Sequence, residues 1–221
     1  MCNPASFVLT RNAAFWSWHT DSHEEIIAEA GLIPDGVRGS NIVRVEVLPP
    51  DYKFDASPDK WKYVIDQPTT PEWYDANDCE RRARLALKEW IAARVIGSGD
   101  VNLSRPGRFY VCGAAVVHAH DNNTVVALDS STVAACGRAK VIARDSSTVY
   151  AAGNCTVWAF GQAVVRVACD NAYVAICDSV KVLSCRDNVT VDQCGGEVAP
   201  PTGYAVVIDR RNGKPVTIVA E

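Results

Sequence analysis

The residues best suited to chemistry lie near the start of the chain. Cys2 directly follows Met1, and removal of that methionine would make the cysteine an N-terminal nucleophile. His23 and Glu24 are the candidates for a group that accepts the thiol proton. No evident base or oxyanion motif stands beside Cys2, and retention of Met1 would remove this nucleophile. An enzyme that uses Cys2 with His23 or Glu24 is therefore an alternative hypothesis.

Two pairs of closely spaced histidines could each bind a metal ion. His19 and His23 are four residues apart, but a helix start between them keeps them off one helical face. His118 and His120 alternate along an extended segment, so they share one face, yet two ligands without a third do not define a metal site. We expect ordinary surface side chains, no metal and no cofactor.

The nine cysteines follow a repeat rather than paired spacings. Cys169, Cys177 and Cys185 are eight residues apart, in a column that otherwise holds Asp or Gly. This pattern predicts reduced cysteines that pack as small side chains. A metal ladder through Cys169 and Cys185 is the alternative, but CxxC pairs and neighbouring histidines are missing.

The elements that carry most of these residues repeat with a period of eight between Ala114 and Cys194. Such a short period predicts a β-solenoid. Valine and alanine stand two residues apart in each unit, for example Val125 and Ala127, so they should face inward from a strand. The clearest units read NTVVALDS, STVAACGR, AKVIARDS, STVYAAGN and CTVWAFGQ.

The outward residues fall into two classes when the units are sorted alternately. One class is mostly large and apolar, and the other is mostly small or polar. Sorting by every third unit mixes the classes, which favours about five coils of sixteen residues and two strands over a triangular coil. The apolar class predicts an exposed stripe of Val126, Leu128, Ile142, Trp158, Phe160, Val174 and Ile176.

A stripe of this kind does not normally stay in water. It could be covered by the N-terminal domain of the same chain. It could also be the interface of a homo-oligomer or of a protein partner, with Trp158 as its anchor.

Around the repeats we expect a mainly β chain with an N-terminal α+β domain. Residues 1–96 form that domain, with helices that begin at Ser22 and at Asp75 or Asn77. Residues 97–113 are a linker and first cap, 114–198 are the solenoid, and 199–221 are a cap formed by a hairpin at Asn212-Gly213.

The composition limits the classes of partner that we expect. The 221-residue chain is 48% hydrophobic and 22% charged, with a formal net charge of −4. No segment is a basic patch, so we expect no nucleic acid, and no apolar run approaches the ~20 residues that span a bilayer. Nothing resembles a signal peptide. Aspartates at the bends allow a DNA-mimic inhibitor as a third hypothesis, although nearby arginines offset them.

Three segments carry a resemblance. The start MCNPASFVLT, the helix SHEEII and the helix start WYDANDCE resemble small uncharacterised proteins of actinobacterial phages, as does the ending VVIDRRNGKP. The resemblance implies a viral product in the host cytoplasm or the virion, without known catalytic residues. The first hypothesis is therefore a non-enzymatic phage protein whose solenoid is an assembly or protein-binding platform.

Overall fold

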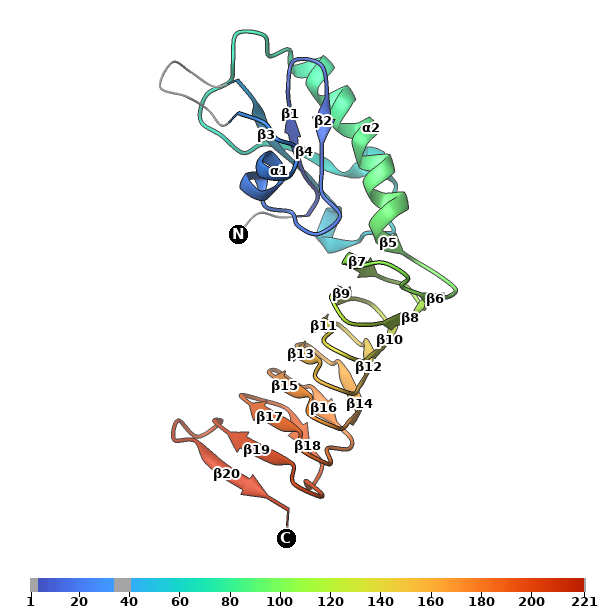
Figure 1. Cartoon of the computed structure of the whole chain (residues 1–221), viewed down its shortest axis with the longest axis vertical. Coiled ribbons are helices and arrows are strands. Elements are labelled where there is room, and N and C mark those ends of the chain that lie inside the picture. Colours follow the sequence, from blue (N-terminus) through green and yellow to red (C-terminus); the bar gives the residue numbers. More distant parts are fainter. Residues whose placement is uncertain (1–3, 34–40, 221) are drawn as a thin grey trace. The chain divides into compact units, whose positions relative to one another are not determined.

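The computed structural model describes residues 4–33 and 41–220 of the chain. It divides into two compact units, Met1–Val95 and Ile96–Glu221, and Figure 1 shows the elements of each. This division falls one residue from the predicted boundary at 96. The first unit is α+β and the second is a β-solenoid, as predicted.

The N-terminal unit is built on an antiparallel sheet with strand order β2-β1-β3-β4. Clean alternation of apolar and polar residues gives β3 one buried face, which packs in the core. The strands are β1 Ser6–Leu9, β2 Ala14–Phe15, β3 Val43–Leu48 and β4 Lys62–Ile65, and the helices are α1 His23–Glu29, α2 Ala76–Arg94 and the 3₁₀ turns Pro50–Tyr52 and Pro58–Lys60.

Both α-helices begin where the sequence predicts. The Ser22 side chain accepts from the backbone N–H of Glu25, and the Asp75 carboxylate accepts from the N–H of Asp78 at 2.8 Å. These side chains satisfy backbone donors that have no partner inside the helix.

The apolar stripe of α2 is formed by the buried Cys79, Ala83, Leu87 and Trp90. Arg94 is completely buried as well. Arg94 follows Trp90 by four residues and therefore continues the stripe. The Asp21 carboxylate, itself 3% exposed, accepts hydrogen bonds from Nη1 and Nη2 of Arg94 at 2.9 and 3.0 Å.

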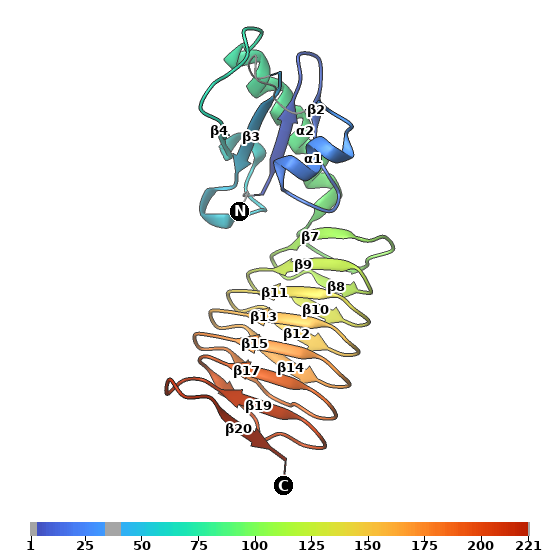
Figure 2. The ribbon, with the colours of Figure 1, turned by 60° about the vertical axis from the view of Figure 1, so that its left-hand side comes forward.

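The second unit consists of two parallel sheets that alternate along the chain (Figure 2). The seven-stranded sheet contains β6 Asp100–Asn102, β8 Val116–Ala119, β10 Thr132–Ala135, β12 Thr148–Ala151, β14 Val164–Ala168, β16 Lys181–Val182 and β18 Glu197–Val198. The nine-stranded sheet contains β5 Val95–Ile96, β7 Gly107–Val111, β9 Asn123–Ala127, β11 Lys140–Ala143, β13 Thr156–Ala159, β15 Tyr173–Ile176, β17 Thr190–Gln193, β19 Val206–Asp209 and β20 Val216–Val219.

Two strands per turn confirm the two-sided coil, but the solenoid is longer than expected. It has about seven turns instead of five. The predicted linker, residues 97–113, contains β6 and β7 and forms the first turn. The predicted cap, residues 199–221, continues the solenoid through β19, which pairs in parallel with β17. β20 pairs in antiparallel fashion with β19, in the predicted hairpin.

Small side chains fill the space between the sheets. Val125, Val133 and Val141 are fully buried, and so are Ala127 and Ala143. Strands in register place equivalent side chains one above another at about 4.8 Å. Valine and alanine repeat because the narrow core between the sheets favours small side chains, although it also accommodates Ile176.

The column of Asp or Gly lies at the bends, where the backbone has positive φ. Asp129 and Asp145 have φ values of 53° and 55°, and Gly137 has 62°. Glycine adopts this left-handed conformation freely, and aspartate tolerates it better than most residues. The carboxylates also form a ladder, because Asp145 Oδ2 accepts from the N–H of Asp129 at 3.1 Å and Asp129 Oδ2 from the N–H of Gly113 at 2.9 Å.

Arg166 is an extra residue in β14 that the eight-residue period does not predict. The register against β12 shifts there, and the turn lengthens from 16 to 17 residues, as in the pairing of Thr156 with Tyr173. Outward assignments between Arg166 and Val182 consequently move by one position. A second extra residue lies between the bends at Asp178 and Asp187, which are nine residues apart, and it returns later residues such as Thr190 to their original face. Cys169 and Cys177 leave the bend column, whose positive-φ residues are Asp170 and Asp178.

Candidate functional site

The predicted apolar stripe is partly wrong. Val174 and Ile176 point into the core and are completely buried, because the extra residue Arg166 reverses their faces. Val126 and Leu128 are outside the core cluster but only 7% and 5% exposed. What remains accessible is an aromatic patch of Ile142, Trp158 and Phe160.

Neighbouring strands hold this aromatic patch. Ile142 of β11 pairs in register with Trp158 of β13, and Phe160 follows β13 by one residue. Phe160 is 36% exposed, and the Arg144 guanidinium lies 5.9 Å from the centre of its ring. Along β9, β11 and β13 and the residue after each, the charged side chains are Lys140 and Arg144. The patch therefore combines apolar area with positive charge.

Two of the N-terminal candidates, His23 and Glu24, are held by partners in the sheet. His23 is 2% exposed, and its Nδ1 lies 3.3 Å from the Asp66 carboxylate while Nε2 lies 3.1 Å from the carbonyl of Val45. Glu24 pairs with Arg44 at 3.0 Å. Cys2 lies outside the described residues. His23 and Glu24 thus have structural partners, which tie α1 to the sheet.

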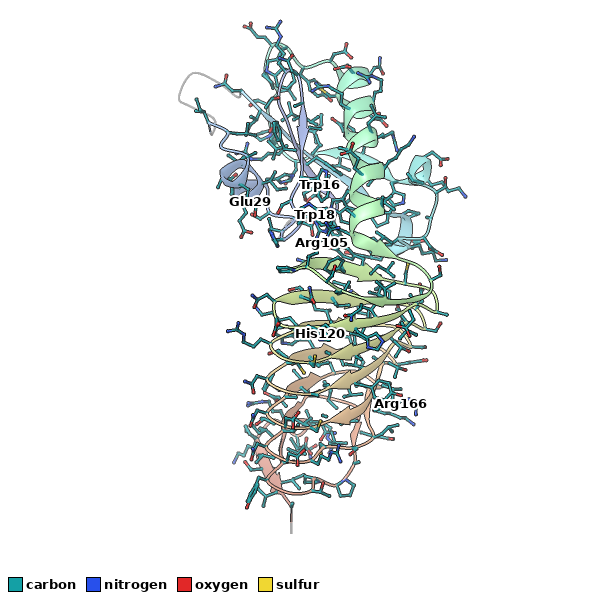
Figure 3. All side chains as sticks on the ribbon, turned by 45° about the vertical axis from the view of Figure 1, so that its right-hand side comes forward. Trp16, Trp18, Glu29, Arg105, His120 and Arg166 are labelled. Atoms are coloured by element: carbon teal, nitrogen blue, oxygen red, sulfur yellow. The ribbon has the colours of Figure 1, made fainter. Side chains whose placement is uncertain are left out.

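The seven-stranded sheet carries a cluster of Cys136, His120 and Asn102 that was not predicted from the sequence. The Cys136 Sγ lies 2.8 Å from Nδ1 of His120, and Nε2 of His120 lies 2.9 Å from Oδ1 of Asn102. His118 lies on the surface as predicted, and its Nε2 is 3.0 Å from the Asp100 carboxylate. Figure 3 shows His120 on the outer surface of the solenoid.

The repeat explains why these side chains meet. His120 and Cys136 each follow the last residue of paired strands, β8 and β10, so they stack one turn apart. Asn123 fixes the bend after β8: its Oδ1 accepts from the N–H of His120 at 2.9 Å, and its Nδ2 donates to the carbonyl of Arg105 at 2.7 Å. The sequence signal was the separation of sixteen residues between a histidine and a cysteine.

Other cysteines of the solenoid lie in environments that keep the thiol protonated. Burial raises the pKa of Cys155 to about 11 and also raises the pKa of Cys169 and Cys185. The described cysteines are free thiols, as expected. The alternative metal ladder is not formed, because Cys185 points into the core while Cys169 lies on the surface.

Cys169 does lie near two carboxylates, with ligand atoms of Cys169, Asp170 and Asp187 within 4.8 Å of one another. Asp187 accepts from the backbone N–H of Asp170 at 3.3 Å, so this cluster is part of the bend ladder. The ladder also bears on the DNA-mimic hypothesis, since several bend carboxylates are occupied by backbone donors of the adjacent turn.

Comparison with protein-family models, with curated proteins and with solved structures finds no match for this chain. Within the described residues, no helix is long and apolar enough to cross a membrane.

Proposed function

We propose that the protein is a binding scaffold whose nine-stranded sheet docks a protein partner on the aromatic patch. The observation that carries this proposal is the outward position of Trp158 and Phe160 on adjacent columns of a flat parallel sheet. Aromatic side chains are enriched among the residues that dominate interface energetics. A solenoid presents them without rearrangement, since β13 is held in the sheet between β11 and β15.

The partner that fits is a protein surface with apolar and acidic side chains. Lys140 and Arg144 supply the charge beside the patch, whereas Asp129 and Asp145 at the adjacent bends accept from backbone N–H groups. A second copy would bring two positively charged patches together, which favours a different partner over a face-to-face dimer. For a chain that resembles actinobacteriophage proteins, that partner would be a virion protein or a host protein in the cytoplasm.

A matched set of fluorescent probes tests this proposal by anisotropy. The probes are a peptide of alternating Glu and Val or Phe, the same peptide with Lys in place of Glu, and a short oligothymidine. The acidic peptide should bind, and Trp158→Ala should weaken binding by about tenfold or more, as expected of an interface anchor. Arg144→Gln should reduce the preference for the acidic over the basic peptide.

Tyr150→Ala is the matched control, because Tyr150 is a 41% exposed aromatic residue on the other sheet. It should leave binding unchanged. Equal binding of both peptides, or equal losses in the Trp158 and Tyr150 variants, would contradict docking on the patch. Preferential binding of the oligothymidine would replace the protein partner with single-stranded nucleic acid. A concentration-dependent dimer that Trp158→Ala abolishes would replace it with a second copy.

A further inference from the structure

The hydrogen bonds in the cluster of Cys136, His120 and Asn102 define which atoms carry protons. An amide oxygen only accepts hydrogen bonds, so the Nε2 atom of His120, 2.9 Å from Asn102 Oδ1, carries a proton. In the neutral ring Nδ1 is then the unprotonated nitrogen. That atom lies 2.8 Å from the Cys136 Sγ and can take the thiol proton. Transfer produces a thiolate beside an imidazolium whose far N–H is still hydrogen-bonded.

Neither a shared metal ion nor a redox pair fits this contact as well. A zinc ion bound by sulfur at about 2.3 Å and nitrogen at about 2.0 Å would hold these two atoms roughly 3.5 Å apart. The observed 2.8 Å is too short for a shared metal and fits a hydrogen bond. A dithiol redox pair needs a second sulfur, but the residues stacked on Cys136 are His120 and Ala152, whose strands β8 and β12 flank β10.

We propose that Cys136 is the nucleophile of an acyl-transfer site, that His120 is its acid–base partner, and that Asn102 positions the imidazole. The assignment rests on the short distances and on the sequence of hydrogen bonds from Cys136 to His120 to Asn102. A nucleophile within reach of a base that a third group orients is the general arrangement of covalent catalysis. The activity goes beyond the scaffold role and does not depend on it, since it lies on the other sheet.

The substrate class is a small acyl thioester. The Cys136 sulfur forms a bond to the carbonyl carbon, the bond from that carbon to the leaving sulfur breaks, and His120 returns its Nδ1 proton to the leaving thiolate. Water then attacks the acyl-cysteine while His120 accepts the water proton and passes it to the Cys136 sulfur. The net reaction converts a thioester and water into a carboxylic acid and a thiol, without an oxidant or reductant.

The surroundings of Cys136 suit a short acyl chain. Ala134 lies two residues earlier on the same face, and Ala152 stacks above, so small side chains occupy these two neighbouring positions. A pocket of about 220 Å³ is lined by His120 and Arg105, and it borders the acid–base partner rather than the nucleophile. Gly137 follows the nucleophile, with Gly153 stacked on it from the next turn and the Asp121 carboxylate beside it from the preceding turn. A backbone N–H after the nucleophile is a common oxyanion donor.

The test uses the full-length protein and S-phenyl thioacetate as the probe. Mass spectrometry of protein quenched before turnover should find acetyl on Cys136, and thiophenol release should give the rate. Cys136→Ala should abolish both signals. His120→Gln should slow acylation by about 100-fold or more, the usual contribution of a positioned acid–base group. Cys169→Ala, an outward cysteine two turns away, is the matched control and should react like the unaltered protein.

Asn102 needs a readout that a purely structural role would not change. Nitrogen NMR of the His120 ring should report the Nε2–H tautomer, and Asn102→Ala should reduce that preference while circular dichroism stays unchanged. Acetylation of Cys169 at the same rate as Cys136 would overturn the proposal. So would a His120→Gln variant that is folded and acylates at the original rate.

Discussion

Replacement of Asp145 separates the two functions of an aspartate at a solenoid bend. Asp145 has φ 55°, and its Oδ2 accepts from the N–H of Asp129 on the preceding turn at 3.1 Å. Asparagine retains both the tolerance of positive φ and a side-chain acceptor. Glycine retains only the first, and alanine retains neither. The series Asp145→Asn, Asp145→Gly and Asp145→Ala therefore isolates each contribution.

The magnitudes follow from these two terms. Loss of an exposed hydrogen bond costs about 0.5–1.5 kcal/mol, so Asp145→Gly should lower the free energy of unfolding by about 1 kcal/mol. A left-handed conformation costs a residue with a Cβ atom on the order of 1–2 kcal/mol. Aspartate already bears part of that cost, so Asp145→Ala should lose about 2 kcal/mol in total. Asp145→Asn should stay within about 0.5 kcal/mol of the original protein, since both features survive.

Urea unfolding followed by far-UV circular dichroism measures these differences in the solenoid. Five of the six tryptophans precede residue 96, so tryptophan fluorescence mainly follows the N-terminal unit and should not change. Ser146→Ala, a substitution at an exposed neighbour on the same bend, is the control. An alanine variant as stable as the asparagine variant would refute the proposed role of the bends, as would a glycine variant less stable than alanine.

Three shorter predictions concern buried groups. Val174→Asp should greatly lower the urea midpoint of the solenoid while Ala175→Asp changes it little, because only Val174 of the two faces the core. A larger effect of Ala175→Asp would mean that the register does not shift at Arg166. Burial raises the pKa of Cys155 from 9.0 to about 11, so this thiol should resist iodoacetamide at pH 8 in the folded protein. The stability that Cys155 contributes is complete below pH 9 and is lost as the pH rises through about 11. Asp21→Ala should cost the N-terminal unit about 3–5 kcal/mol because it leaves the buried Arg94 charge unpaired, whereas Asp21→Leu with Arg94→Met should cost less; tryptophan fluorescence in urea compares them.

The period of eight was sufficient to predict a solenoid, because every strand must present small residues to the same narrow core, and alternate sorting of the outward residues indicated two strands per turn. Asp or Gly at each bend was visible in the sequence for the related reason that the backbone there has positive φ. The extra residue at Arg166 was not visible. The segment Val165–Ala168 stays rich in apolar residues, so hydrophobic alternation alone gives no sign of which residue is extra. One such insertion was enough to put Val174 on the wrong face.

The chemistry was harder to predict than the fold because it depends on stacking between turns. His120 and Cys136 could have been paired from their separation of sixteen residues once the coil length was known. Asn102 could not, since it precedes His120 by eighteen residues and reaches it diagonally from β6. Arg94 shows the same limit in the N-terminal unit, because its partner Asp21 is distant in the sequence. The expectation of a non-enzymatic protein remains a prediction, which the acylation experiment tests.

A two-sided solenoid can carry two such surfaces because its core constrains only inward residues. Trp158 points outward between the buried Val157 and Ala159, so replacing it leaves the inward residues of its strand unchanged. Cys136 stands on the other sheet, across the same core. Sites without shared partners contribute independently to stability and function. The double variant of Trp158 and Cys136 should therefore lose peptide binding and thioester acylation to the same extents as the single variants, and any coupling between the losses would mean that the core transmits changes from one sheet to the other.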